Sequence, residues 1–594
     1  MPEKRFSIKK EALNKYLIDI FIAFFYLIMA CAYCYPAFFE GKNILGIWDN
    51  KYMIWEMWTL HKNLFVEPNN PWIVDNIYYP YGYISILYVS IIPDLIGSVL
   101  LNFFNLITTY NIIIIFSFFS AALFMYIFLN YLFKDKWAAF FGGCLYGFSS
   151  YTQVLMTYGH NNLICIQFFP LFVMSVFMLK EKITPFRNLF FFISYVLLGL
   201  TNPYYFIYLL VFFLTYLVIY DHFTKKLSKE FLLNFIVISF FATIVLFMFY
   251  YPNQVGKYDS PDVKYLKNIG SYAYFSNDAI NFFIPPPTNP LWRHFTIFLN
   301  GKLGHGDTQF FGYSVLALVF ITLFFSKWKD KKFWLIYLII VSILSLGPLL
   351  KFYGHVYKIP LPYLVFTKTP IVWGLRAPSR LNAAIIFSLC ILTAEAIRFL
   401  KCKYSSKIFY PVYIILLLAV LYENIYLDYS VLPEPKSINV RYSSAEIPAF
   451  YKDLANRDDV NVLMELPSGN EQLCEIYDYE YMYYQTYHNK KIMSGKVPRY
   501  LEKYEEIRTQ DPILKYFYVP ALISSMSKEE REKVVNGTIP KLKELKVDYL
   551  ILHPLIDWII PTDKYNDLKN LIFEIFGNKI EQKDNLWVVD IRKL

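Results

Sequence analysis

Long apolar runs separated by short polar loops fill the first 430 positions of the chain. Runs such as residues 235–251 reach the ~17–25 apolar residues that a helix needs to cross a bilayer. The pattern predicts a polytopic α-helical membrane protein with about eleven transmembrane helices. The predicted spans lie near residues 16–39, 111–133, 137–156, 160–179, 187–200, 203–220, 231–251, 309–326, 333–350, 379–397 and 408–428.

The stretch from residue 84 to residue 107 is apolar but carries Pro93 and Asp94 at its centre. Proline removes a helical hydrogen bond and a carboxylate is costly at bilayer depth, so we expect a re-entrant or interfacial pair of short helices here. If this stretch does not cross and the N-terminus is cytoplasmic, every strong basic cluster falls in a cytoplasmic loop, as the positive-inside rule requires. The segments then expected outside the cytoplasm are residues 40–83, 252–308, 351–378 and the C-terminal tail.

The character of the chain changes near residue 431, where the apolar runs end. We therefore divide the chain into a transmembrane domain, residues 1–430, and an extracytoplasmic tail, residues 431–594. Strand-like runs in the tail, such as VNVLMELPS and VDYLILHP, alternate with helix-like ones, which predicts a small α/β domain. No GxGxxG or P-loop sequence accompanies these strands, so the sequence gives no evidence of nucleotide binding there.

Composition excludes a soluble protein of this length, because 56% of the 594 residues are hydrophobic and 18% are charged. The net charge of +10 does not indicate nucleic-acid binding, since most basic residues lie in short loops between apolar spans, where they set the topology. Of the seven cysteines, only Cys474 lies in the polar tail, so no disulfide bond is expected within that domain.

The first long loop, residues 40–83, places acidic and aromatic residues next to the membrane surface. Asp49 lies about ten residues beyond the first span, and Asp75 follows in the aromatic stretch VDNIYYPYG. A carboxylate between aromatic walls can accept a proton from a sugar hydroxyl or hold a divalent cation beside a lipid phosphate. The alternative for Asp49 is the N-cap of a helix that begins near Lys51, and the residues alone leave both roles open.

The order of these features resembles the GT-C superfamily of integral membrane glycosyltransferases, and more narrowly a bacterial polytopic group with an extracytoplasmic C-terminal domain. The implied function is inverting transfer of a sugar from a polyprenyl-phosphate-linked donor on the outer face, with Asp49 as the catalytic base. Further pieces similar to that group follow in order: GHNNLICIQFFPL (159–171), YFSNDAINFFIPP (274–286), LSLGPLL (344–350), TPIVWGLRAPSRL (369–381), VLMELPSG and YYQTYHNKKIMSG.

The first loop departs from some GT-C enzymes, which carry two adjacent acidic residues or a DxD sequence. Asp49 has no acidic neighbour, so we favour a metal-independent reaction, with Mg²⁺ or Mn²⁺ and Asp75 as a second ligand left as the alternative. His305 and Asp307 lie two residues apart, which is more typical of loop structure than of a metal site. His488 is in the tail, which need not face the reaction.

Four further residues are candidates for substrate binding. His160 stands at an extracytoplasmic helix end, where the resembled group also has a histidine, and its alternative role is that of an interfacial histidine. Asp278 lies in the first of two lid-like loops, 252–308 and 351–378, where it touches substrate or anchors the loop. Arg376 and Arg380 are basic residues outside the cytoplasm, and a guanidinium group grips phosphate bidentately; the alternative is contact with lipid headgroups.

We therefore expect a multi-pass glycosyltransferase of the bacterial inner membrane, which moves the sugar to an envelope glycan, lipid or protein. Two other classes stay open. A transporter or flippase of lipid-linked glycans would need ionisable residues within the spans, which the predicted spans almost lack. A non-catalytic scaffold for envelope assembly would use the tail as its binding module and would tolerate loss of Asp49. No nucleic-acid partner is expected.

Overall fold

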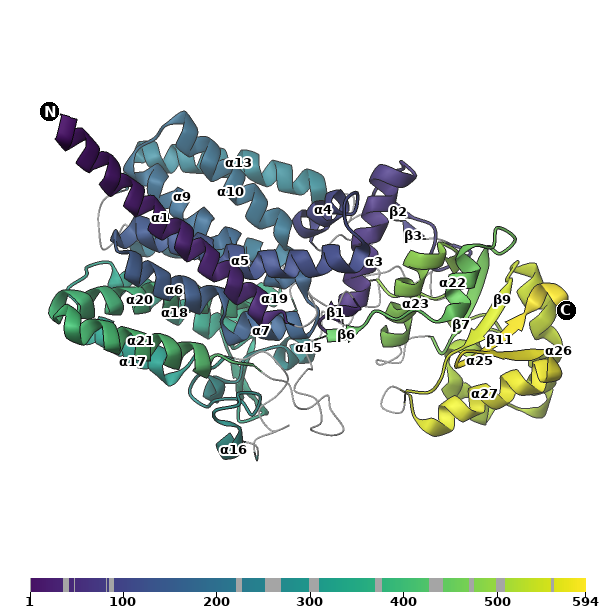
Figure 1. Cartoon of the computed structure of the whole chain (residues 1–594). Coiled ribbons are helices and arrows are strands. Elements are labelled where there is room, and N and C mark those ends of the chain that lie inside the picture. The colour runs from purple at the N-terminus through teal and green to yellow at the C-terminus, as the bar shows by residue number, and fades with distance from the viewer. Residues whose placement is uncertain are drawn as a thin grey trace.

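A bundle of long helices and a smaller sheet domain lie at opposite ends of the molecule, with the N-terminus at the far end of the bundle from the sheet (Figure 1). The computed structural model describes residues 2–594 except 36–41, 48, 82, 85–89, 221–226, 251–268, 297, 299–308, 369–375, 427–441, 469–474, 498–507 and 557–559.

Within the described residues, seven helical segments are long and apolar enough to cross a membrane, which makes the protein polytopic and helical. They are α1 (Pro2–Tyr33), α5 (Leu106–Phe133), α8 with α9 (Asn161–Ile164, Phe168–Glu181), α11 with η2 (Pro203–Thr215, Tyr216–Tyr220), α13 (Lys229–Tyr250), η8 with α20 (Pro378–Leu381, Asn382–Lys403) and α21 (Ser406–Glu423).

The other four predicted spans coincide with shorter helices. Gly147 and Phe148 end α6, and a new helix starts at Ser150, so the predicted span 137–156 is broken in two. The number of eleven full spans therefore stays a prediction. The shorter helices are α6 (Lys136–Gly147) with α7 (Ser150–Thr157), α10 (Pro185–Thr201), α17 (Tyr313–Phe325) and α18 (Lys331–Ser345).

The apolar stretch around Pro93 forms α4 (Ile91–Leu100), a helix of 10 residues. At 1.5 Å per residue it is about 15 Å long, half the thickness of a bilayer core, so it cannot cross. Asp94 is fully buried, and Gly97 lets α4 approach the first loop, since a Cβ on this glycine would lie 2.2 Å from Sδ of Met57. This agrees with the expectation that the stretch does not span the membrane.

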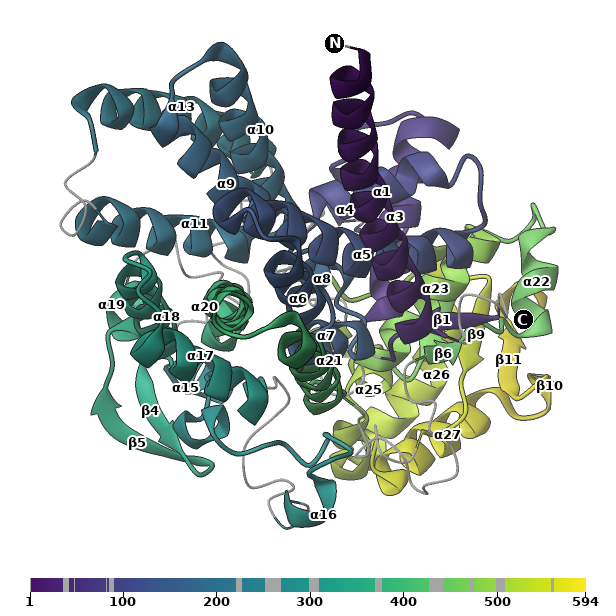
Figure 2. The same cartoon turned by 60° about the vertical axis from the view of Figure 1, so that its left-hand side comes forward.

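Helix α20 lies at the centre of the bundle and packs against α6, α17 and α18 (Figure 2). Of its most apolar window, 89% is buried, whereas α1 and α13 are 17% and 22% buried. Helices with such exposed apolar faces are expected to contact lipid. Phe387 on α20 packs edge-on against Phe169 on α9, with ring centroids 4.7 Å apart, which is typical of the aromatic contacts in this core.

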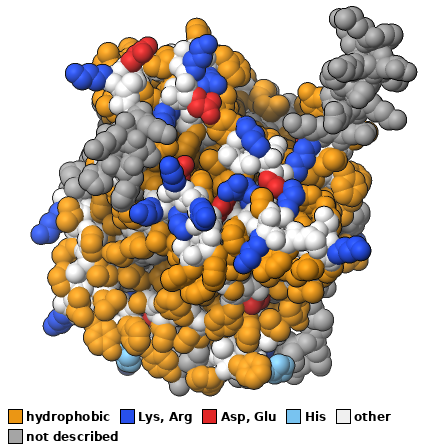
Figure 3. Space-filling view, turned by 90° about the vertical axis from the view of Figure 1, so that its left-hand side faces the viewer, with side chains coloured by type: hydrophobic (Ala, Val, Ile, Leu, Met, Phe, Trp, Pro, Cys, Tyr) orange, Lys and Arg blue, Asp and Glu red, His pale blue; other side chains and the backbone are white. Residues whose placement is uncertain are grey.

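Lys and Arg side chains gather at the end of the bundle that lies away from the sheet, which Figure 3 shows face-on. Four of the five basic clusters predicted for cytoplasmic loops occupy the turns between α5 and α6, α9 and α10, α17 and α18, and α20 and α21. The fifth, Lys225, Lys226 and Lys229, falls mostly outside the described residues. Lys401 is paired there with Asp135 at 2.7 Å, and Lys136 with Asp19 at 2.7 Å. This arrangement fits a cytoplasmic N-terminus, although the sidedness stays a prediction.

The tail forms a five-stranded sheet in the order β10-β11-β9-β7-β8. Strand β7 is parallel to β8 and β9, whereas β11 is antiparallel to β9 and β10. Every residue of β7 and β9 is buried, as expected for central strands covered on both faces. The strands are β7 (Val462–Leu466), β8 (Lys491–Ile492), β9 (Tyr549–Leu552), β10 (Ile580–Lys583) and β11 (Leu586–Asp590).

The strand-like runs predicted in the tail coincide with β7, β8, β9 and β11. The predicted domain boundary after residue 430 lies in the range 427–441, outside the described residues. The helices beside the sheet are α22 (Ala449–Ala455), α23 (Glu475–His488), α25 (Lys515–Tyr518), η9 (Pro520–Ser525), α26 (Lys528–Glu544), α27 (Thr562–Phe576), η10 (Gly577–Lys579) and η11 (Ile591–Lys593).

Small elements join the two parts of the molecule. Strand β1 in the first loop pairs antiparallel with β6 at the start of the tail, so the first loop and the tail are tied together. The remaining elements are β1 (Asn43–Leu45), α3 (Asn50–His61), η1 (Lys62–Val66), β2 (Ile73–Val74), β3 (Tyr83–Ile84), α15 (Ile269–Tyr274), η5 (Ala279–Phe282), α16 (Arg293–Thr296), β4 (Leu349–Phe352), β5 (His355–Pro360), α19 (Tyr363–Thr367) and β6 (Tyr442–Ser444).

Candidate active site

The first loop is held against the segment that follows α7 by its backbone. The amide of Ile47 donates to the carbonyl of Thr157 (2.9 Å), and that of Asp49 donates to the carbonyl of Tyr158 (3.0 Å). Gly159 has a φ of 73°, and a Cβ there would lie 2.4 Å from the backbone nitrogen of Asn50. Only glycine fits this close approach, so the turn before His160 and the start of α3 are locked together.

Asn50 anchors the loop from the inside. Its side chain is fully buried, and its amide nitrogen donates to the carbonyl of Gly46 (2.6 Å) and to the hydroxyl of Ser443 in β6 (2.8 Å). Buried amides with such partners fix backbone position, because breaking any one bond leaves a polar group unpaired. Asn50 thereby fixes the position of its neighbour Asp49 without using the Asp49 carboxylate.

The carboxylate of Asp49 faces His160, with Oδ2 lying 3.1 Å from Nε2 of the imidazole. Asp49 occupies the N-cap position of α3, yet its side chain makes no capping hydrogen bond. Its side chain is 33% exposed and that of His160 is 23% exposed, so both are reachable from outside. The capping alternative for Asp49 therefore lacks the bond that defines it.

The contact with Asp49 also decides which atom of His160 can act as a donor there. A carboxylate only accepts hydrogen bonds, so the group of His160 that can donate to Asp49 is the N–H at Nε2. Within the described part of the chain, Nδ1 is buried and has no hydrogen-bond partner. His160 thus orients Asp49 through the contact of Nε2 with Oδ2. This contact leaves Oδ1 of the carboxylate for another donor.

Asp75 lies away from this pair. Its side chain is 78% exposed and pairs with Lys491 of β8 at 3.1 Å. It lines a cavity together with Thr59, near the end of α3. Because α3 has 12 residues and rises 1.5 Å per residue, its two ends are about 18 Å apart. The structure therefore does not bring Asp75 together with Asp49.

Asp278 anchors a loop. It is 1% exposed, and its carboxylate accepts hydrogen bonds from the backbone amides of Ile280 (3.2 Å), Tyr353 (3.0 Å) and Gly354 (2.6 Å). It thus caps η5 and holds the turn of the β4–β5 hairpin at the same time. Of its two predicted roles, the structure places Asp278 in the anchoring one.

Arg376 and Arg380 both lie over aromatic rings beside the start of α20. The guanidinium carbon of Arg376 is 5.0 Å from the ring centroid of Phe275, and that of Arg380 is 4.3 Å from that of Tyr204. The carbonyl of Arg380 accepts hydrogen bonds from the hydroxyls of Tyr151 (3.2 Å) and Tyr208. For Arg376, stacking on a ring leaves the edge of the guanidinium group, with its N–H donors, accessible to an anion.

The tail packs directly against the first loop. Nε1 of Trp55 donates to Oε1 of Gln485 (2.7 Å), and Lys51 forms an ion pair with Glu480. Gln485 and Glu480 both lie on α23. The amide of Ile492 in β8 donates to the carbonyl of Asn76 (2.9 Å). The tail therefore supports the helix that begins at Asp49, a contact that the sequence did not predict.

His488 has a structural role in this region. It is buried and stacked on Tyr451, with ring centroids 5.5 Å apart. Burial, together with nearby Lys490, lowers the pKa of His488 to about 3, so the ring is neutral at physiological pH. His305 and Asp307, which the sequence favours as part of a loop and not as a metal site, lie outside the described residues.

No protein-family model and no curated protein sequence match the chain. It aligns with the crystal structure of the Archaeoglobus fulgidus oligosaccharyltransferase tethered to an acceptor peptide, over 93% of its own length and 71% of that chain, with a TM-score of 0.50 and 12% identity. The chain has a GT-C fold. Two structures of ArnT from Cupriavidus metallidurans, apo and bound to undecaprenyl phosphate, align at TM-scores of 0.48 and 0.47 with 10% and 9% identity, over 98% and 96% of this chain and 98% and 97% of those chains.

The surroundings of Asp49 do not match those of a divalent-cation site. The Asp49 carboxylate has an imidazole donor beside it, whereas Mg²⁺ and Mn²⁺ prefer several oxygen ligands. Within the described residues, no three His, Cys, Asp or Glu side chains are grouped closely enough to hold a metal ion. The donors around Asp49 therefore do not fit a cation, and Asp75 is too distant to serve as a second ligand.

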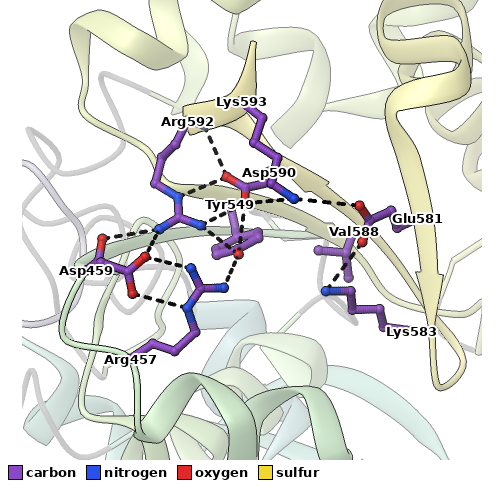
Figure 4. A pocket seen from close by; sticks show the side chains of 9 residues that line it. All are labelled: Arg457, Asp459, Tyr549, Glu581, Lys583, Val588, Asp590, Arg592 and Lys593. Atoms are coloured by element: carbon purple, nitrogen blue, oxygen red, sulfur yellow. Dashed lines mark hydrogen bonds and ion pairs between the residues drawn. The ribbon is translucent and has the colours of Figure 1, made fainter.

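A separate cavity of about 250 Å³ lies at the amino ends of β7 and β9 in the GT-C protein's tail (Figure 4). Asp459 accepts hydrogen bonds from Arg457 (2.6 Å) and Arg592 (2.5 Å), and Arg592 also pairs with Asp590 at 2.7 Å. The hydrogen bonds from Arg457 and then Arg592 hold the pKa of Asp459 below its ordinary value, so it stays ionised. These charges satisfy one another, which indicates a structural clamp between strands.

Proposed function

We propose that this protein is an inverting glycosyltransferase, which transfers a sugar from a polyprenyl-phosphate-linked donor to an envelope glycan, lipid or protein. The reaction takes place on the extracytoplasmic face of the bacterial inner membrane, where the sheet domain also lies. The GT-C fold supports this class, since the oligosaccharyltransferase that shares it is named for sugar transfer. Fold alone does not assign an activity, so the proposal depends on the site.

The observation that carries the proposal is the partly exposed pair of Asp49 and His160. A carboxylate that makes no capping bond, lies beside an imidazole and remains reachable from outside has the features of a general base. Asn50 and Gly159 fix the backbone on both sides of the pair, so the carboxylate is held in place before substrate binds.

In the proposed reaction, Asp49 accepts the proton of the acceptor hydroxyl through Oδ1. The hydroxyl oxygen then bonds to the anomeric carbon of the donor, and the bond from that carbon to the phosphate oxygen breaks. The electron pair of that bond leaves with the polyprenyl phosphate, and attack from the opposite side inverts the anomeric carbon. His160 stays a positioning residue, because its Nε2–H holds Oδ2 and takes no proton from the substrate.

We assign the phosphate of the donor to Arg376, with Arg380 beside it. As the glycosidic bond breaks, negative charge grows on the leaving phosphate, and a guanidinium group stabilises it with two parallel hydrogen bonds. The ring of Phe275 under Arg376 keeps the guanidinium plane oriented, which lowers the entropy lost on binding.

The test uses a strain that lacks this protein, in which polyprenyl-linked sugars and envelope glycans are measured by mass spectrometry. We expect a donor to accumulate, a glycan to lose its sugar, and the wild-type gene to restore both. Asp49→Asn should restore neither, since loss of a general base costs about 10²–10⁴-fold in rate. The exposed Asp458→Asn, which makes the same acid-to-amide change in the tail, should complement fully.

An Asp49→Asn protein that restores the glycan at the wild-type rate would remove the base from the mechanism. The transporter and scaffold classes would then be favoured over the enzyme.

A further inference from the structure

The β4–β5 hairpin and the short helix α19 that follows it form one segment, residues 349–368, at the periphery of the helix bundle (Figure 2). Nine consecutive residues of this segment, 352–360, are exposed. They include every residue of β5, so neither face of this strand is covered within the described residues. A two-stranded hairpin is at best marginally stable in water, which indicates that another surface covers this one.

Most of the exposed side chains of the segment are apolar or aromatic. They are between 37% and 68% exposed. Exposed apolar groups of this kind mark a surface that binds a protein or a membrane. Tyrosine beside aliphatic side chains is typical of the membrane–water interface, where the ring is in apolar surroundings and the hydroxyl is hydrated. The side chains are those of Phe352, Tyr353, Val356, Tyr357, Ile359 and Val365.

The charges of the segment all have one sign. It contains three lysines and no aspartate or glutamate. Lys358 and Lys368 are exposed, whereas Lys351 is buried with Asp278 as its electrostatic neighbour. A surface that faces only water usually mixes both signs, as the exposed first turn of α26 does. Exposed lysines between apolar side chains therefore match an anionic and partly apolar partner, which a phospholipid surface is.

The preceding helix places the segment at the level of the membrane surface. Helix α18 begins at Lys331 in a basic turn and has 15 residues. It therefore rises about 22 Å, which leaves about 8 Å of a ~30 Å hydrocarbon core to the residues that follow. Ile339 and Ile343 of α18 are exposed, as expected for lipid contact up to the last turn, and β4 begins four residues after α18 ends. The hairpin thus starts near the membrane–water boundary opposite the basic end.

The fold holds the hairpin in this position. Tyr353 and Gly354 form its two-residue loop with φ of 51° and 78°, the left-handed values that a tight hairpin needs. The carboxylate of Asp278 accepts hydrogen bonds from both of their amides (3.0 and 2.6 Å). Strand β4 also contacts η5 and α15. The exposed side chains are therefore presented on a fixed frame.

We propose that the segment 349–368 is a membrane-interface anchor that binds anionic phospholipid headgroups in the leaflet on the side of the sheet domain. Val356 and Ile359 enter the apolar part of the interface, and Tyr357 lies at the level of the headgroups. Lys358 and Lys368 pair with the phosphates, because their long stems let the ammonium groups reach them. This anchor depends neither on sugar transfer nor on which side of the membrane holds the sheet domain.

The first test locates the hairpin in purified full-length protein, in nanodiscs of phosphatidylcholine and phosphatidylglycerol. Val356→Cys and Ile359→Cys each carry a nitroxide label, in a background with Cys402→Ser and Cys474→Ser. We expect both labels to collide more often with oxygen, which concentrates in lipid, than with a water-soluble nickel chelate. The control label at Asp458→Cys, an exposed position in the tail, should show the opposite preference.

The second test asks which lipid is bound. A fluorophore on Val356→Cys is quenched by spin-labelled phosphatidylglycerol or by spin-labelled phosphatidylcholine at equal fractions in the same nanodiscs. We expect stronger quenching by phosphatidylglycerol. The double variant Lys358→Gln, Lys368→Gln should lower this preference about fivefold for each lysine, since a basic side chain at an anionic surface contributes about that factor.

The matched control is Lys528→Gln with Lys579→Gln, which removes the same charge at two exposed positions of the tail and should keep the preference. Two results would overturn the inference. One is a preference for the nickel chelate at both hairpin positions, which would leave the surface in water for a protein partner. The other is equal quenching by the two lipids, or a preference that the lysine double variant does not change.

Discussion

At the residue scale, the function of Asp49 depends on which of its oxygens is occupied. His160 engages Oδ2 at 3.1 Å, whereas no capping bond engages the carboxylate. A hydrogen bond to a charged group contributes about 1.5–3 kcal/mol to the stability of the arrangement that contains it. The histidine therefore acts through the aspartate, and its loss should be felt in turnover before it is felt in folding.

His160→Ala should lower kcat by about 10- to 100-fold, because the carboxylate loses the imidazole that orients it. His160→Gln keeps an N–H donor and should recover most of the rate, with KM for the donor close to that of the wild type in both variants. The measurement is initial sugar transfer in membranes with matched protein levels. Equal rates for the alanine and glutamine variants would contradict a positioning role.

Arg376→Lys should weaken binding of a polyprenyl-phosphate sugar about tenfold, since an ammonium group keeps the charge but loses the planar fork that grips phosphate. Binding is measured by titration of the detergent-solubilised protein. The control is Arg398→Lys, whose arginine pairs with Glu395 at the opposite end of the bundle and should leave the affinity unchanged. Unchanged affinity in Arg376→Lys would instead assign Arg376 to lipid headgroups.

At the scale of elements, α3 is the connection between the candidate site and the tail. Gln485 of α23 accepts from Trp55 of α3 (2.7 Å) and donates to the carbonyl of Asn76 (2.6 Å), so one side chain joins two separate segments of the first loop to the tail. Each of these groups is buried, and an unpaired buried group costs about 1–3 kcal/mol. The position of Asp49 at the start of α3 is therefore sensitive to the tail.

Gln485→Ala should destabilise the protein by about 1–3 kcal/mol and lower the rate of sugar transfer, because Trp55 loses its partner and α3 loosens at its tail contact. Thermal unfolding and limited proteolysis of the first loop would measure the effect. Gln582→Ala, at an exposed position of β10, is the matched control and should change neither. Wild-type stability in Gln485→Ala would show that this contact does not hold the loop.

At the scale of the whole molecule, charged and apolar side chains are distributed unevenly over the surface. Basic residues gather at the helix ends farthest from the sheet (Figure 3), and the apolar windows of α1 and α13 are mostly not buried. Such a distribution orients a helical membrane protein with its basic end in the cytoplasm. The candidate site and the sheet domain would then share the extracytoplasmic side.

We therefore expect a cysteine at Asp458 in the tail to react with a membrane-impermeant maleimide in intact cells, and a cysteine at Lys329 between α17 and α18 to react only after the membrane is opened. Lys329 and Asp458 are both exposed, so a lack of labelling at either position would not be due to burial of the side chain in the protein. A Cys402→Ser, Cys474→Ser background removes the exposed native thiol of the basic end and the native thiol of the tail. Labelling of Lys329→Cys from outside, or protection of Asp458→Cys, would invert the proposed topology.

The sequence by itself determined the helical membrane domain and the strands of the tail. Apolar length and strand alternation are local properties, so they survive without knowledge of the fold. It also selected Asp49 and His160 as separate candidates. The break of the predicted span 137–156 at Phe148 was missed, although the sequence carries a signal for it: Ser149 is the N-cap of α7, and its side chain accepts from the amide of Thr152.

Only the tertiary structure decided how the candidates are used. Asp49 and His160 are far apart in the chain, and their contact depends on Gly159 and Asn50 locking two segments together. The same packing separates Asp75 from Asp49. Sequence reveals which side chains carry chemistry, whereas distance, burial and hydrogen-bond partners arise from contacts between remote segments, which no local pattern records.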